Sequence, residues 1–116
     1  MGYDFHITRA SEWTDSEAAP IRLDEWKGYV AYDREFRLDN FAEVTNRQGE
    51  AIRYENEGLA VWTAYSGHGQ AGNMAWFDYR RGRIVVKNAD DEIRAKMKQI
   101  AEILGARVVG DEGEEY

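Results

Sequence analysis

The chain has 116 residues, no cysteine, and 22 acidic against 15 basic residues, which gives a net charge of −7. This length fits one domain spanning residues 1–116, and the lack of cysteine excludes disulfides, thiol nucleophiles and cysteine metal sites. The negative charge would repel phosphate backbones, so it argues against nucleic-acid binding.

The first predicted elements are a strand and a helix, separated by a polar connection. Residues 3–9 place apolar side chains at every second position, which is the period of a half-buried strand. Residues 10–20 are mostly polar and end at Pro20, a residue favoured at the start of a helix. Apolar residues, Trp26 among them, then recur at steps of three and four and predict an amphipathic helix over residues 21–33.

The middle of the chain is expected to contain short strands. The apolar residues of the segment 34–50 follow neither the helical nor the strand period strongly, and within it we predict a short strand at 41–45 and a turn at 47–49. Further strands are predicted at 51–54 and at 59–65, where β-branched and aromatic residues are frequent.

A β-hairpin is predicted around a two-residue turn at Arg81 and Gly82. This turn fixes the register, and the expected cross-strand pairs are Tyr79–Ile84, Phe77–Val86, Asp78–Val85 and Trp76–Lys87. The hairpin then has an apolar face that suits the core and a second face with Trp76, Asp78 and Lys87.

The second predicted helix follows this hairpin. We expect Asn88 to cap its start, with Asp91 three residues further on. Apolar side chains over residues 93–104 recur at steps of four, three and four, and Gly105 is a favourable stop.

Together these elements predict an α+β fold. A last short strand is expected at 106–109, before an acidic tail at about 110–116 that is polar enough to be solvated or flexible. We predict a mostly antiparallel sheet of about five to six strands with two amphipathic helices on one face. The opposite face would then be available for contact with a partner.

Exposed aromatic rings are typical binding anchors, and an acidic surface attracts a basic partner. On that basis we predict partner-binding residues at Trp62, His68, Trp76, Asp78, Glu114 and Glu115.

An alternative is a polar site on the open sheet face, which would make the chain a small enzyme or a ligand-binding domain. Its residues would be His6, Thr8, Asp78 and His68. His6 and Thr8 are two positions apart on a strand, roughly 6 to 7 Å, which is too far for direct contact. The glycine-rich loop at 66–72 matches neither the phosphate-binding nor the dinucleotide-binding pattern. We therefore predict no catalytic residue, no cofactor and no metal site.

Several blocks of the chain resemble a family of short, acidic, uncharacterised bacterial proteins. The blocks are MGYDFHITR, LDEWKGYV, GLAVWTAYSG, MAWFDY and IVVKNADDEIRAKMKQIAEILGARVVGDEG. The resemblance covers nearly the whole length and implies one intact domain. In size, charge and lack of a catalytic motif such proteins are similar in type to cytoplasmic immunity proteins that neutralise bacterial toxins, and this likeness assigns no individual residue a role.

The leading functional hypothesis is therefore a non-catalytic protein-binding module, an immunity-like inhibitor of a toxin. The expected partner is a basic protein, and self-association as a homodimer is a further alternative. The sequence has neither a signal-peptide pattern nor an apolar run of about 18 residues, so we expect it in the cytoplasm and not in a membrane.

Overall fold

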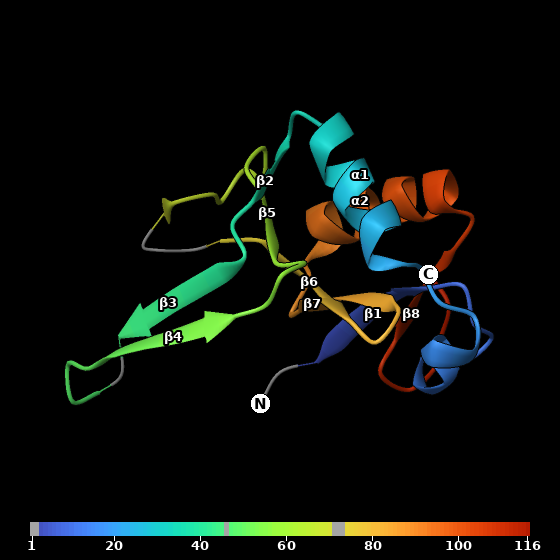
Figure 1. Cartoon of the computed structure of the whole chain (residues 1–116), viewed down its shortest axis with the longest axis horizontal. Helices are drawn as coiled ribbons and strands as arrows, with labels where there is room; N and C mark the ends of the chain where they lie inside the picture. The colour runs from blue at the N-terminus through green and yellow to red at the C-terminus, as the bar shows by residue number, and fades with distance from the viewer. Residues whose placement is uncertain (1–2, 46, 71–73) are drawn as a thin grey trace.

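The computed structural model of the chain describes residues 3–45, 47–70 and 74–116. The elements in chain order are β1 (Asp4–Thr8), the 3₁₀ helix η1 (Trp13–Ala18), α1 (Leu23–Tyr32), β2 (Phe36–Leu38), β3 (Phe41–Thr45), β4 (Ala51–Glu55), β5 (Ala60–Trp62), β6 (Trp76–Arg80), β7 (Arg83–Lys87), α2 (Asp91–Leu104) and β8 (Arg107–Gly110). Six strands form one sheet in the order β2-β5-β6-β7-β1-β8, and β3 pairs with β4 as a separate hairpin (Figure 1). The predicted α+β fold is confirmed.

Both α-helices cover the same face of the sheet (Figure 1). Trp26 of α1 and Met97 of α2 are fully buried against Phe77 and Ile84 of the sheet. The indole Nε1–H of Trp26 donates to the carbonyl of Gly58 at 2.8 Å, so the polar edge of this buried ring is satisfied. In the described part of the chain, neither helix has the length and apolar content needed to cross a membrane.

The start of α2 differs from the prediction. Asp90, not Asn88, is the N-cap, and its carboxylate accepts the backbone N–H of Ile93 at 2.9 Å. Asn88 instead adopts a left-handed backbone conformation with φ 53° and accepts the N–H of Tyr3 at 3.1 Å. Asn88 is thus used to turn the chain after β7, and the helix can begin only afterwards. The predicted stop at Gly105 is confirmed, with φ 66°.

Two short elements were not predicted, β2 and η1. Strand β2 has three residues, too few to show a period, and it is fixed by pairing Phe36 with Trp62 of β5. The helix η1 is held by tertiary contacts: Trp13 stacks on His6 with ring centroids 4.2 Å apart, and Ser16 Oγ donates to the carbonyl of Arg81 at 2.8 Å. Through these contacts η1 covers part of β1 on the sheet face opposite the helices.

The β6–β7 hairpin has the predicted register but a shorter ladder. Its pairs are Asp78–Val85, Tyr79–Ile84 and Arg80–Arg83. The expected pairs Phe77–Val86 and Trp76–Lys87 are absent, although all four residues are described. The first half of β6 pairs only with β5, through Ala60–Phe77 and Val61–Trp76, and the second half of β7 continues along β1. The two strands therefore separate beyond Asp78 and Val85.

Candidate binding site on the open face of the sheet

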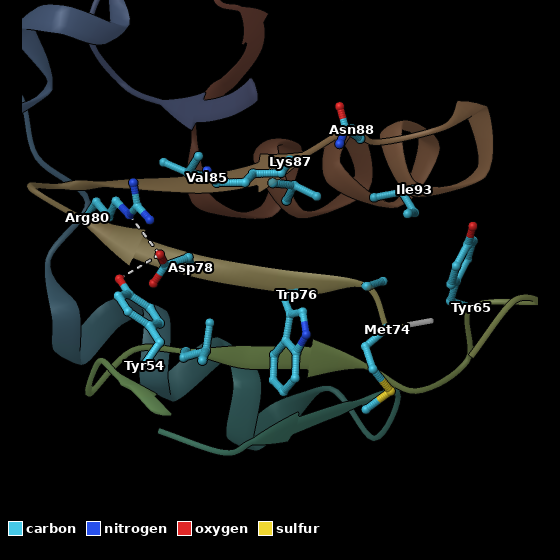
Figure 2. A pocket seen from close by; sticks show the side chains of 13 residues that line it. Tyr54, Tyr65, Met74, Trp76, Asp78, Arg80, Val85, Lys87, Asn88 and Ile93 are labelled. Carbon is cyan, nitrogen blue, oxygen red and sulfur yellow. Dashed lines mark hydrogen bonds and ion pairs between the residues drawn. The ribbon is translucent and has the colours of Figure 1, made fainter. Parts of the chain in front are cut away.

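A pocket of about 500 Å³ opens where β6 and β7 separate. Trp76 and Asp78 border it from β6, and Val85 and Lys87 from β7 (Figure 2). The pocket is also lined by Ile93 of α2, a core residue only 5% exposed. The hollow therefore extends from the open face between the strands towards the helix layer.

Asp78 anchors the β3–β4 hairpin to the sheet. Its carboxylate accepts the Tyr54 hydroxyl at 3.0 Å, the Arg80 Nε–H at 2.7 Å and an Asn56 amide hydrogen. The same Asn56 amide group also donates to the carbonyl of Tyr79 at 2.7 Å. Asp78 is 7% exposed and holds one wall of the pocket, Tyr54, in place.

Trp76 and Trp62 lie on opposite faces of the sheet. Trp76 is partly exposed on the pocket side, as the alternation along β6 predicts. Trp62 is 7% exposed on the helix side, where its indole N–H donates to Glu35 at 3.0 Å and its ring lies 5.9 Å from Lys96 Nζ. Trp62 is thus part of the core and is separated from Trp76.

His6 lies on the open face but is only 1% exposed, because Trp13 covers it. Arg83 Nε–H donates to His6 Nδ1 at 3.2 Å, which leaves Nε2–H to donate to Asp111 at 2.8 Å. This places the neutral imidazole with its proton on Nε2. Burial lowers the pKa of His6, and the nearby Arg83 charge adds to that effect against the opposing influence of Asp111.

Thr8, the hydroxyl considered beside His6, is fully buried and its Oγ1 accepts the backbone N–H of Ala10 at 3.1 Å. Neither Thr8 nor Asp78 is hydrogen-bonded to His6. The hydrogen bonds of these three side chains all link parts of the fold to one another.

His68 lies in the loop between β5 and β6. Its backbone N–H donates to the carbonyl of Tyr65 at 2.9 Å, and its buried Nδ1 has no hydrogen-bond partner among the described residues. Ser66 ties this loop to α2 through Glu92, with contacts of 2.5 and 3.0 Å. His68 does not line the pocket.

Glu114 and Glu115 lie at the β8 end of the molecule, three strands from β6 in the sheet order. Glu114 accepts the Tyr3 hydroxyl, and Glu115 forms a bridge with Val109. The N–H of Tyr116 donates to the carbonyl of Val108 at 2.9 Å, so the tail runs back along β8. Of the predicted partner-binding residues, the structure brings only Trp76 and Asp78 together at the pocket.

The β3–β4 hairpin is the part of this surface that sequence reasoning did not select. It extends away from the sheet and helices (Figure 1), and it exposes Phe41 at 37%, Ile52 at 49% and Tyr54 at 43%. The strand register puts Ile52 and Tyr54 on one face of the hairpin and Phe41 on the other, where the Arg53 guanidinium lies 3.9 Å from the centre of the Phe41 ring. A usable signal was the pair of large apolar residues two positions apart in a short strand that is otherwise polar.

No protein-family model, curated protein sequence or solved structure matches this chain.

Proposed function

We propose that this protein is a non-catalytic protein-binding module that contacts its partner through the β3–β4 hairpin. One observation carries the proposal. Six large apolar side chains are exposed among the described residues, and three of them lie on this one hairpin. The strand register puts Ile52 and Tyr54 together on one face and Phe41 on the other, so Ile52 and Tyr54 form the exposed apolar cluster. Clustered exposed apolar groups are typical of interaction sites, whereas single ones are common on any surface.

The backbone of the hairpin supports the same proposal. Among the described strands, β3 and β4 pair only with each other, so each has an outer edge that is free of ladder pairing. An extended segment of a partner can add to such an edge through main-chain hydrogen bonds. The exposed side chains would then supply apolar contacts beside the added strand.

More specifically, we propose that the protein is an immunity-like inhibitor, located in the cytoplasm, that neutralises a bacterial toxin. The net charge of −7 supports a basic partner, since complementary charge accelerates encounter. A stable complex of this kind buries about 1,600 Å² in total. The hairpin alone is small, so the interface would extend onto the neighbouring open face around Trp76.

The test is capture of partners from a bacterial lysate with the tagged chain as bait. Mass spectrometry would identify what stays bound after a salt wash. Ile52→Glu places a charge on the hairpin, and Ile103→Glu places the same charge on α2, where Ile103 is 58% exposed. We expect one stoichiometric basic protein with the wild type and with the Ile103→Glu chain, and at least a tenfold lower yield with Ile52→Glu.

Two results would contradict the proposal. One is equal capture by all three chains, which would place the contact elsewhere. The other is a blank lane together with a concentration-dependent dimer in light scattering, which would favour self-association.

A further inference from the structure

We propose that the pocket between β6 and β7 binds a small carboxylic acid with an aromatic or branched apolar body. Ligand binding in this pocket does not require a protein partner at the hairpin. Its volume of about 500 Å³ lies within the range of small-molecule sites, roughly 300 to 1,000 Å³. Arg80 and Asn56 fix the carboxylate of Asp78, and Asp78 in turn accepts the Tyr54 hydroxyl, so the Tyr54 wall is in place before a ligand arrives.

The apolar body of the ligand would contact Trp76, Val85 and Met74, which line the pocket (Figure 2). Trp76 offers a flat ring against which a planar group can stack. The pocket also reaches Ile93 in the helix layer, so an apolar group entering between the strands would be removed from water. Apolar lining with a few polar groups is the usual character of a small-molecule site.

Two polar groups beside the pocket have no partner within the described part of the chain, and both are donors. The indole N–H groups of Trp13, Trp26 and Trp62 each have an acceptor, whereas that of Trp76 has none in the described part of the chain. Lys87 likewise forms no ion pair or hydrogen bond with a described residue. By contrast, the acceptor oxygens of Asp78 already receive three side-chain donors.

The charges of the lining lead to the same ligand class. The charged side chains that line the pocket are Asp78, Arg80 and Lys87. The first two form an ion pair at 2.7 Å. The ammonium of Lys87 forms no ion pair with a described residue, although Asp4 of β1 is its cross-strand neighbour. An unpaired cation and a free N–H donor at an apolar pocket favour an anionic acceptor, and a carboxylate supplies both charge and acceptor oxygens.

The overall charge of −7 opposes an anion only at a distance. At physiological ionic strength the Debye length is about 8 Å, so remote charges slow encounter but weakly affect the contact inside the pocket. Binding should therefore be measured near that ionic strength.

The experiment is a ¹H–¹⁵N NMR titration of the full chain with two matched probes, indole-3-acetate and neutral indole-3-acetamide. The reporter is the indole N–H signal of Trp76, assigned by its loss in Trp76→Phe. We expect saturable shifts of this signal with the acid, and about tenfold weaker binding of the amide, because the amide lacks the charge. The indole signal of Trp13, whose N–H is bonded to the Asp111 carbonyl, should stay in place.

A pair of lysine variants tests the cation. Lys87→Met should weaken binding of the acid by about tenfold and leave binding of the amide unchanged, while Lys98→Met, an exposed lysine on α2, should change neither. The inference is overturned if acid and amide bind equally, if Lys87→Met has no effect, or if the Trp76 signal does not shift at millimolar acid.

Discussion

Tyr54 of the hairpin donates its hydroxyl hydrogen to Asp78 of β6 at 3.0 Å. The bond joins two separate sheets and helps to set the hairpin beside the pocket. Tyr54→Phe removes only the hydroxyl, so we predict faster amide hydrogen exchange in β3 and β4 with a global loss of about 1 kcal/mol. Tyr32→Phe, at a tyrosine that is 80% exposed on α1, is the control. Unchanged exchange in both variants would show that the bond does not hold the hairpin.

Acidification should destabilise the fold through His6. Burial lowers the pKa of His6 below its usual 6.5. Between that lowered value and about 6.5 the unfolded chain binds more protons than the folded one, so stability falls as the pH falls. The stability that the neutral, buried His6 contributes is fully present above pH 6.5. It is lost as the pH drops towards the pKa of His6 in the folded protein. The slope cannot exceed about 1.4 kcal/mol per pH unit for one group.

The measurement is urea unfolding at several pH values between 7 and 5. The groups that face His6 are Asp111, Arg83, Trp13 and Asp4. His6→Gln keeps a donor for Asp111 but does not titrate, so its stability should vary less over this range. An equally steep profile in His6→Gln would assign the pH dependence to other groups.

Lys96 should be far more important for stability than its neighbour on the helix, Lys98. Its ammonium is buried between Asp33 at 2.8 Å and Glu35 at 2.9 Å. Lys96→Met would leave both carboxylates without their cation, and we predict a loss of about 3 kcal/mol in the free energy of unfolding. Lys98→Met should stay within about 0.5 kcal/mol. Similar urea midpoints for the two variants would contradict this.

Two glycines should respond to alanine with opposite signs. Gly28 lies within α1, and an added Cβ there meets nothing within 4 Å, so Gly28→Ala should stabilise by about 0.5 to 1 kcal/mol. At Gly58 the added Cβ would lie 2.4 Å from Cβ of Tyr79, whose hydroxyl is bonded to the Ile21 carbonyl. We predict that Gly58→Ala destabilises by about 1 to 3 kcal/mol. Thermal unfolding checks both, and the same sign for both would refute the packing argument.

Much of the fold could be predicted because periodicity and turn chemistry are local. Three local patterns each predicted an element correctly. Alternation predicted the strand β1, the 4-3-4 spacing predicted the helix α2, and the two-residue turn after Arg80 predicted the β6–β7 hairpin. The cap of α2 was misplaced because Asn88 and Asp90 are both good capping residues, and the choice depends on the contact of Asn88 with Tyr3, 85 positions away.

The site was less predictable, since it depends on long-range placement. Alternation along β6 correctly put Trp76 and Asp78 on the open face. The pocket exists because the β6–β7 ladder stops at Asp78 and Val85. A register derived from the turn assumes that pairing continues along both strands, so it did not predict this opening. The contact between Tyr54 and Asp78 joins two elements that no local pattern relates. Trp62 points to the helices because Val61 pairs with Trp76, a register that the sequence did not determine.

The most direct test of the account is hydrogen exchange of this chain, measured alone and in complex with the protein captured from the lysate. We expect protection on binding in residues 41–45 and 51–55, with a smaller effect at residues 76–80. The outer side of α1 and α2 should exchange at the same rate in both states. Protection confined to the helices or to the tail after β8 would contradict the claim that the hairpin is the binding surface.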